Sequence, residues 1–193
     1  MKKVSSVVIV LAIAAVAVLW GVSVYNKLVK EDEAVNAAWS QVENVYQRRS
    51  DLIPNLVATV KGYAAHESST LEAVVEARSK ATQVNVGDLS EEGVRSFQAA
   101  QGEVSSALSR LLAVVENYPD LKANQNFLDL QAQLEGTENR IAEARRVFNE
   151  TARGFNTYVR SFPANIVASL FKFQVKGYFT ADEAAKAAPK VEF

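Results

Sequence analysis

Residues 4–26 read VSSVVIVLAIAAVAVLWGVSVYN, an uncharged run that lies between Lys2 and Lys3 on one side and Lys27 on the other. As an α-helix with about 1.5 Å per residue, the run would be roughly 34 Å long, and a bilayer core is about 30 Å thick. Trp20 and Tyr25 lie near its C-terminal end, where aromatic rings favour the headgroup level of a membrane. The run therefore predicts an N-terminal membrane anchor, residues 1–26, with membrane lipid around it.

A cleaved signal peptide is the alternative interpretation of this run, because it too combines lysines, an apolar stretch and small residues. The run is longer than the ~7–15 apolar residues of a usual signal peptide. Its A-x-A triplets, at 12–14 and 15–17, lie inside the run and not after it, and the chain contains no Cys that could carry a lipoprotein anchor. These features favour a retained, single-pass anchor.

The charges on the two sides of the run predict its orientation. Lys2, Lys3 and the terminal amine lie on one side, and Lys27 and Lys30 lie on the other. Positive charge favours the cytoplasmic side, so the difference of about one charge favours an N-terminus in the cytoplasm. We therefore expect the rest of the chain on the extracytoplasmic side of the membrane.

Composition narrows the class of protein. The 193-residue chain contains 21 Lys and Arg against 22 Asp and Glu, and this balance argues against nucleic acid as a partner. The absence of Cys excludes disulfides, zinc–thiolate sites and thiol catalysis. With 8 Gly and 4 Pro, the chain has few residues that interrupt secondary structure, and its frequent Ala, Leu, Glu and Gln favour long helices.

Four segments place apolar residues at alternating steps of three and four, the spacing of helices that pack side by side at shallow angles. They cover residues 28–52, 53–74, 94–118 and 127–162. Short connections make neighbouring helices antiparallel, so we expect an all-α fold whose N-terminal transmembrane helix continues into an antiparallel up-down four-helix bundle over residues 27–162. The core positions expected on the two clearest segments are Leu108, Leu111, Ile141 and Phe148.

Three breaks are expected between these helices. Proline is tolerated in a first helical turn but not inside a helix, so a new helix would begin just before Pro54 with Asp51 as its cap. Asp88 and Glu91, three residues apart, resemble a capping box at the second break. Pro119 marks the third break, and one long final helix is expected to follow it.

Residues 163–180 form a short amphipathic and aromatic segment after the bundle. Its rings either lie in a membrane interface or close one end of the bundle core, and we favour the core. Because four helices can close without these rings, we also expect a homo-oligomer whose contacts include the segment. The four rings are Phe171, Phe173, Tyr178 and Phe179. Residues 181–193 contain little to bury and are expected to form a flexible tail.

His66 is the single histidine of the chain and adjoins Glu67. Neighbouring residues on a helix point in diverging directions, so this pair would not converge on one ligand. We expect a partly exposed helix histidine with no metal or acid–base role. The sequence also contains no nucleophile elbow, phosphate-binding loop or dinucleotide-binding glycine pattern, so no enzyme activity and no cofactor are expected.

The stretch from Glu138 to Arg153 is dense in charged and amide side chains, and a solvated helix face is its usual meaning. The alternative is a polar network across the bundle, which would fix the helix register more than it would add stability. In that alternative, side chains of this stretch reach side chains of the first helices. They are Asn139, Arg140 and Asn149 on one side and Arg49, Asp51 and Asn55 on the other.

Several stretches are together specific for one family: YNKLV at 25–29, AWSQV at 38–42, RRSDLIPNLV at 48–57, YPDLKA at 118–123 and LEGTENRI at 134–141. On these stretches the chain resembles the LemA family over nearly all of its length. The resemblance implies a bacterial inner-membrane protein with one N-terminal membrane helix and an antiparallel helical bundle. It implies no catalytic residues, and the association of some members with membrane proteases or membrane organisation fits an adaptor.

The expected function is that of a non-enzymatic, membrane-anchored helical scaffold or adaptor, which acts through contacts with protein partners or with itself. One alternative is a module that binds a small or peptidic ligand in the bundle through Asn55, Lys61, His66 and Arg140. A weaker alternative is a hydrolase with a site at His66 and Glu67. The long helical segments and the lack of a nucleophile–base set in the sequence favour the scaffold.

Overall fold

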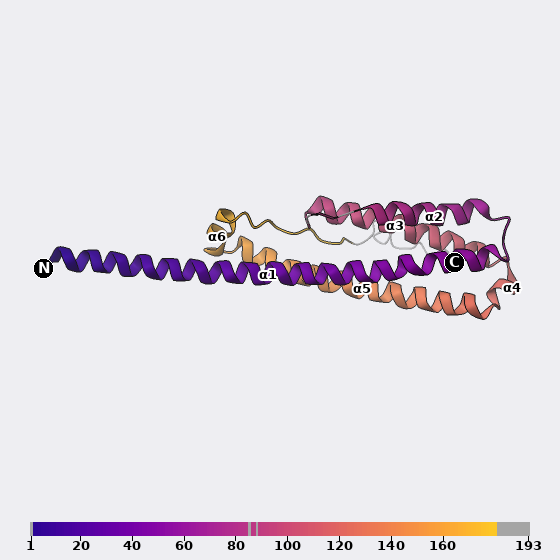
Figure 1. Ribbon diagram of the computed structural model, residues 1–193, viewed down its shortest axis with the longest axis horizontal. Coiled ribbons are helices and arrows are strands. Elements are labelled where there is room, and N and C mark those ends of the chain that lie inside the picture. The colour runs from indigo at the N-terminus through magenta and orange to yellow at the C-terminus, as the bar shows by residue number, and fades with distance from the viewer. Residues whose placement is uncertain (1, 85, 88, 181–193) are drawn as a thin grey trace, which may run out of the picture.

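The computed structural model describes residues 2–84, 86–87 and 89–180, and this part of the chain is helical with no strand. A short extended segment follows the last helix (Figure 1). The helices are α1 (Lys2–Lys61), α2 (Ser68–Gln83), α3 (Glu91–Val115), α4 (Pro119–Lys122), α5 (Gln125–Arg160) and α6 (Ala164–Leu170). The expectation of an all-α chain is confirmed over the described residues.

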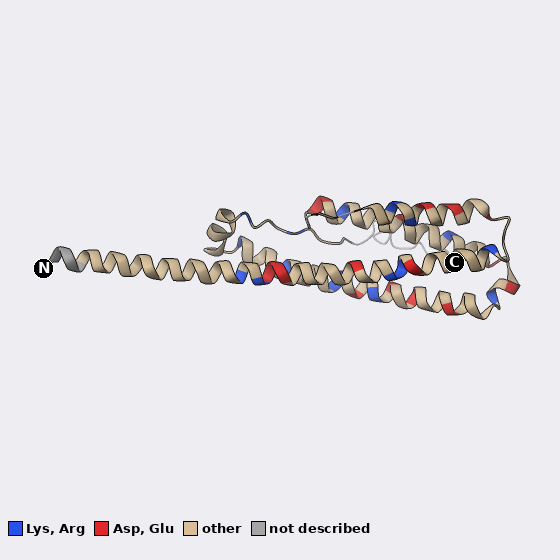
Figure 2. Cartoon of the chain, in the orientation of Figure 1, with Lys and Arg blue, Asp and Glu red and all other residues tan. Residues whose placement is uncertain are grey.

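Helix α1 joins two chemically different parts of the chain without a break. Its first part projects from the other helices as a single rod, and no charged residue lies between Lys3 and Lys27 (Figure 2). The side chains of residues 6–20 are all exposed. By length and composition, α1 is the one helix in the described part of the chain that qualifies as a candidate membrane span. The expected continuous helix through residue 26 is confirmed, whereas the division into an anchor and a body at that point stays a prediction.

The expected helix boundary just before Pro54 is wrong, because Pro54 lies inside α1. Proline has no N–H to donate to the carbonyl four residues earlier, which here belongs to Ser50. Arg78 of α2 takes over that role, and its Nε donates to the Ser50 carbonyl at 2.9 Å. A tertiary hydrogen bond thus replaces the missing helical one, and α1 runs on to Lys61.

The long helices pack pairwise into a body beside the projecting rod. Helix α1 packs along α5, α2 packs on α3, and α2 also contacts α1. Successive long helices run in alternating directions, and α4 makes the turn into α5 at the end of the body far from the rod (Figure 1). Helix α6 packs on both α1 and α5 near the place where the rod leaves the body.

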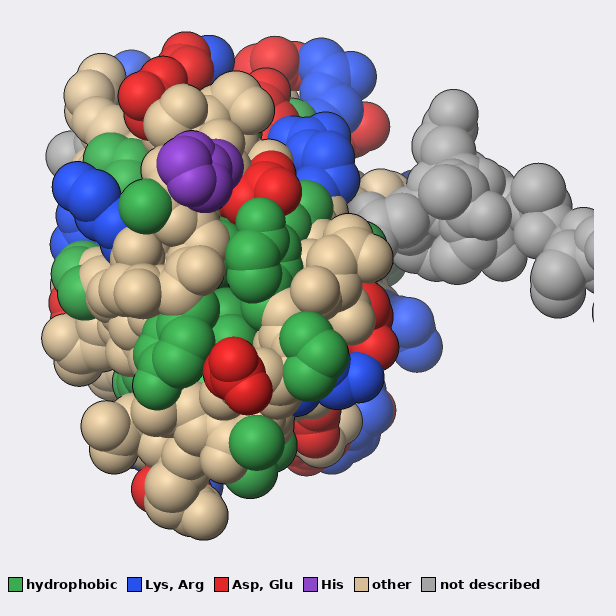
Figure 3. All heavy atoms as spheres, turned by 90° about the vertical axis from the view of Figure 1, so that its right-hand side faces the viewer, with side chains coloured by type: hydrophobic (Ala, Val, Ile, Leu, Met, Phe, Trp, Pro, Cys, Tyr) green, Lys and Arg blue, Asp and Glu red, His purple; other side chains and the backbone are tan. Residues whose placement is uncertain are grey.

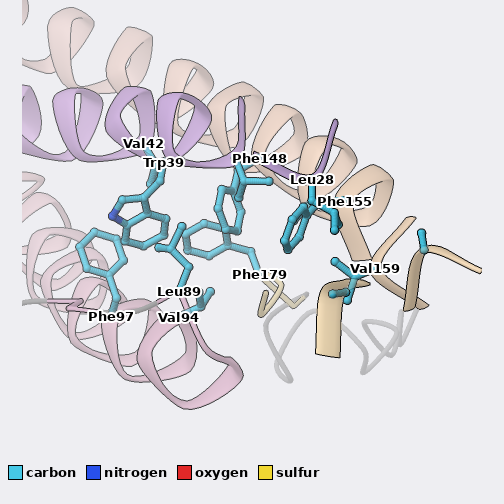
Figure 4. Close-up of a cluster of buried hydrophobic side chains, with 14 of the residues drawn as sticks. Leu28, Trp39, Val42, Leu89, Val94, Phe97, Phe148, Phe155, Val159 and Phe179 are labelled. Atoms are coloured by element: carbon cyan, nitrogen blue, oxygen red, sulfur yellow. The ribbon is translucent and has the colours of Figure 1, made fainter. Parts of the chain in front are cut away.

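The core has two clusters of buried side chains. The cluster nearer the rod is rich in aromatic rings, with the Trp39 ring 5.0 Å from Phe97 and 5.3 Å from Phe148 between ring centroids (Figure 4). The second cluster, farther from the rod, is mainly aliphatic. Burial of the four core positions expected from the heptad pattern is confirmed, namely Leu108, Leu111, Ile141 and Phe148.

The helix ends show which capping signals act. Ser90 is the N-cap of α3, and its hydroxyl accepts a hydrogen bond from the Gly93 amide at 3.2 Å. The cap is therefore Ser90 and not Asp88, which itself lies outside the described residues. Asn124 caps α5 by accepting from the Phe127 amide at 3.1 Å, and this long final helix follows the break at Pro119 as expected. Side-chain caps of this kind stabilise a helix by about 1 kcal/mol each.

Candidate functional site

Residues 173–180, here called the strap, follow the turn after α6 and lie in extended form along the body. An extended segment without a partner strand leaves its backbone groups unpaired unless side chains supply the bonds. Three amide side chains do so, because an amide can donate and accept at once. Each accepts from the N–H and donates to the C=O of one strap residue at 2.7–3.0 Å: Asn156 pairs with Lys176, Asn149 with Phe179 and Gln98 with Thr180.

The rings of the expected interaction segment divide between the core and the surface. Phe179 is buried, and its ring stacks on Trp39 with 5.8 Å between centroids. Phe173 is half-buried beside Phe155 at 6.4 Å. Phe171 and Tyr178 remain exposed. The strap therefore completes the aromatic core of its own chain, in line with the favoured interpretation, and an apolar patch of all four rings does not form.

Gly177 lets the strap approach the start of α3 closely. Its amide donates to the Leu89 carbonyl at 2.7 Å. A Cβ at this position would lie 2.7 Å from both the Glu91 Cα and the Ser90 carbonyl oxygen. Because both of these atoms belong to the backbone, no side chain can turn aside to make room.

Gly177→Ala is therefore expected to lower the free energy of unfolding by about 1–3 kcal/mol, the usual range for overpacking. The added methyl would push the strap outward and loosen Phe179. Chemical denaturation of the detergent-solubilised protein measures the change. Gly154→Ala is the matched control, because it lies inside α5 with nothing within 4 Å of its added Cβ. This control should gain roughly 0.5–1 kcal/mol, and a similar loss at both glycines would contradict the close approach.

Arg49 of α1 forms a buried polar network, with 2% of its side chain exposed. Its Nη1 donates to Glu138 Oε1 at 2.7 Å and to Ser105 Oγ at 2.8 Å. Its Nη2 donates to Gln101 twice, to Oε1 at 2.6 Å and to the carbonyl oxygen at 3.1 Å. These bonds tie α1 to α3 and α5. Burial raises the pKa of the neighbouring Tyr46 phenol, whose ring lies 5.0 Å from the guanidinium carbon.

The partners of Arg49 differ from the expected ones. Asn139 and Arg140 are exposed on α5, one and two positions past Glu138 and therefore turned away from Arg49. Asn55 is exposed on α1, and Asp51 accepts from Gln47 at 2.7 Å within the same helix. Asn149, as described above, holds the strap. A polar network is thus present, and it is centred on Arg49. Its partner on α5 is Glu138, and not Asn139 or Arg140 as expected.

His66 lies in the turn between α1 and α2, and not on a helix as expected. It is exposed at the end of the body far from the rod, where Figure 3 shows the histidine on the surface. Glu67 is engaged elsewhere and accepts a hydrogen bond from the Tyr118 hydroxyl at 2.9 Å, which raises the pKa of that phenol. Among the described residues, no three His, Asp or Glu side chains converge on a possible metal ion.

Two of the hollows on the described surface bear on the ligand-binding alternative. One of about 290 Å³ lies between α3 and α5 and is lined by both apolar and polar side chains, including Leu108, Leu112, Leu134, Ser105 and Glu138. Another of about 490 Å³ lies between α1 and α2 beside Lys61. Of the residues predicted for ligand contact, Lys61 alone lines this second hollow, while Asn55, His66 and Arg140 line neither. Neither hollow is therefore lined by more than one of those four residues.

The amide contacts of the strap were not predicted from the sequence, although the spacing of two asparagines on α5 indicated part of them. Asn149 and Asn156 are seven residues apart on one helix, so they share a face, and each directly follows a ring of the aromatic seam, Phe148 or Phe155. Buried amides require partners, and this spacing indicates a shared one. Nothing in the sequence spacing links either residue to Lys176 or Phe179, because those pairings join segments that meet only in the folded chain.

Known proteins resemble this chain over most of its length. A family model described as the LemA family matches residues 38–193. The magnetosome protein MamQ 2 of Paramagnetospirillum magneticum is 28% identical over 176 residues, which are 80% of this chain and 64% of that protein. MamQ of Magnetospirillum gryphiswaldense is 27% identical over 174 residues, with the same coverage.

Protein LemA of Metamycoplasma hominis is 26% identical over 158 residues, which are 82% of this chain and 69% of that protein. The chain thus spans a little under two thirds of the length of the MamQ proteins and somewhat more of the Metamycoplasma protein. The family match extends through α1 from Ala38 to the end of the chain and includes the residues that hold the strap and Arg49. On this match, the chain belongs to the LemA family.

Proposed function

We propose that the protein is a non-enzymatic helical scaffold or adaptor, which a single α1 span holds in a bacterial inner membrane. The observation that carries this proposal is the continuity of α1. Its exposed apolar part passes directly into a part whose Val35 and Val42 are fully buried in the body. Membership of the LemA family and the likeness to proteins named for magnetosomes suggest a membrane-associated, non-catalytic protein. The adaptor role goes beyond what these similarities suggest and is our proposal.

The arrangement of the body supports a scaffold. Alternating helix directions are compatible with an antiparallel up-down four-helix bundle of α1, α2, α3 and α5, which we include in the proposal. The charges beside residues 4–26 favour the body on the extracytoplasmic side. Protein partners or a second copy, and not nucleic acid, are the occupants we propose for its surface. Phe179 is not part of a self-contact, because its own core buries it.

A binding module remains the second candidate, and one observation favours it. The hollow between α3 and α5 combines three leucines with Ser105 and Glu138, as small-ligand sites combine an apolar wall with a few polar groups. Leu112→Trp would fill this hollow without touching α1. Loss of a cellular phenotype at unchanged stability would then favour a ligand over a scaffold.

The membrane part of the proposal predicts a shift between cell fractions. Two arginines near the centre of the apolar run, in Ile13→Arg with Val16→Arg, each oppose insertion by about 2.5–3.5 kcal/mol. We expect the parent protein in membranes, resistant to high salt and alkaline washes, and the variant in the soluble fraction. The control is Leu128→Arg with Val147→Arg, because both residues are exposed on α5. A parent protein that washes off at alkaline pH would refute the anchor.

The adaptor part is tested by photo-crosslinking from the body of the intact protein. A photoreactive residue replaces Val75 on α2 or Leu128 on α5, which are both exposed. Discrete adducts that disappear in the Ile13→Arg, Val16→Arg variant support a membrane-bound partner, and absence of adducts at both positions contradicts the adaptor. His66→Ala with Glu67→Gln should leave the adducts and any phenotype unchanged, whereas a lost phenotype at unchanged stability would favour the hydrolase.

A further inference from the structure

The bulky apolar side chains of the body with the highest exposed fractions lie in and around α6. Phe162 just before this helix is 81% exposed, Leu170 at its end is 74% exposed, and Ile166 between them is 58% exposed. Phe171, directly after the helix, is also exposed. Single exposed apolar residues need no explanation, but four bulky ones within ten residues mark a surface that meets something other than water.

Helix α6 is apolar on two opposite faces. One face, with Ala164, Val167 and Ala168, is buried against the body. Ile166 and Leu170 are four residues apart and therefore share the other face, which is exposed. A surface helix of a water-soluble protein usually turns a polar face outward. Here the outward face carries Ile166 and Leu170 beside the uncharged Asn165 and Ser169, and the helix carries no charge between Ala164 and Leu170.

The position of α6 along α1 identifies what covers this face. α6 belongs to the same buried cluster as Val24, and the Phe171 ring lies 4.6 Å from the ring of Tyr25. These α1 residues are the last turn of the uncharged run of residues 4–26. That run is roughly 34 Å long as a helix, a few ångströms more than a bilayer core of about 30 Å. Its last turn, and α6 beside it, therefore lie at the level where core and headgroups meet.

The charges around α6 also suit the boundary between the bilayer core and the headgroups. Arg160 precedes the helix and Lys172 follows it, and both side chains are exposed. Lys27, the first charge after the uncharged run, lies over the Tyr158 ring at 4.3 Å from its centroid. Long cationic side chains and aromatic rings are the residues that favour the headgroup region. Figure 1 shows α6 at the end of the body from which the rod emerges.

We propose that the exposed face of α6, with Phe162 and Phe171, inserts into the interfacial layer of the same bilayer that α1 crosses. This inference rests on the proposed membrane span. The occupant is lipid, because the patch continues the apolar surface of α1 at the same depth. Two membrane contacts fix the rotation of the body about α1, which a single helix leaves free. The body then presents one defined side to its partners.

The absence of Cys makes the test direct, because a spin label can be placed at one chosen position. The full-length protein is reconstituted in phosphatidylcholine–phosphatidylglycerol vesicles with a single label at Ile166→Cys or Leu170→Cys. Leu19→Cys reports the span, and Leu128→Cys is the matched water-exposed leucine on the body. The measurement is the ratio of collision rates with oxygen, which concentrates in lipid, and with a nickel chelate, which stays in water.

We expect the oxygen-to-nickel ratio at residues 166 and 170 to be several-fold higher than at residue 128 and to approach that at residue 19. A low ratio at residues 166 and 170 with a high ratio at residue 19 overturns the inference and leaves the span intact. A low ratio at residue 19 overturns the span and the inference together. Low collision rates with both reagents at residues 166 and 170 would show a protein contact, such as a second copy, and would also overturn the lipid contact.

Discussion

Replacing Phe148 with alanine is expected to lower the free energy of unfolding by about 3–5 kcal/mol, the range for deleting a buried aromatic ring. Phe148 is fully buried and packs against both Trp39 and Phe179, with ring centroids at 5.3 and 5.6 Å. The deletion leaves a cavity where α1, α5 and the strap meet (Figure 4), so neither helix can close it alone. Denaturant unfolding in detergent, followed by near-ultraviolet circular dichroism, measures the loss.

Phe162→Ala removes the same ring from a site that is 81% exposed and serves as the matched control. In detergent it should change the free energy of unfolding by less than about 0.5 kcal/mol, as substitutions of exposed residues usually do. A loss at Phe148 no larger than the loss at Phe162 would mean that the aromatic cluster does not stabilise the fold. Such a result would also undermine the packing assigned to the strap.

Removing the carboxylate that faces Arg49, in Glu138→Ala, is expected to cost roughly 2–3 kcal/mol. The guanidinium would stay buried without its counter-charge, and Gln101 and Ser105 alone would hold it. The loss should fall below that of a fully buried ion pair, because Glu138 is 49% exposed and water reaches it. Thermal and denaturant unfolding of the detergent-solubilised protein give the value.

Two comparisons separate the buried charge from other causes. Glu143→Ala breaks an exposed pair with Arg146 on the same helix, and it should cost no more than about 1 kcal/mol. Arg49→Met combined with Glu138→Leu removes both charges and should recover much of the stability that Glu138→Ala loses. If the double variant is no more stable than Glu138→Ala, the network adds net stability over an apolar pair and the prediction fails.

The spacing of apolar residues and the position of Pro119 were sufficient for most of the helix positions, whereas the caps expected at Asp51 and Asp88 were wrong. Pro119 marked the turn before α5, and the spacing of apolar residues identified Leu111 and Phe148 as core. These features depend on local geometry, namely the period of one helix and the unpaired groups at its ends. The error at Pro54 came from the same local rule, because Arg78, which restores the missing hydrogen bond, is 28 residues from Ser50.

The candidate sites were less predictable than the helices. Arg49 was named only as one of six residues in an alternative to a solvated helix face, and the choice among Glu138, Asn139 and Arg140 as its partner depends on the rotation of α5 about its axis. One residue along a helix is a turn of about 100°, so a small change in packing selects a different partner. The strap was placed in the core by its rings, whereas the amides that hold its backbone could not be assigned to it.

The sequence by itself determined the all-α class, the apolar rod at the start of α1 and the division of apolar from polar helix faces. Each of these follows from sums over neighbouring residues, such as helix propensity and the transfer of side chains from water. The tertiary structure alone decided the continuity of α1 through Pro54, the partners of Arg49 and the path of the strap. Those features depend on hydrogen bonds and close contacts between segments far apart in the chain, which exist only once the helices have packed.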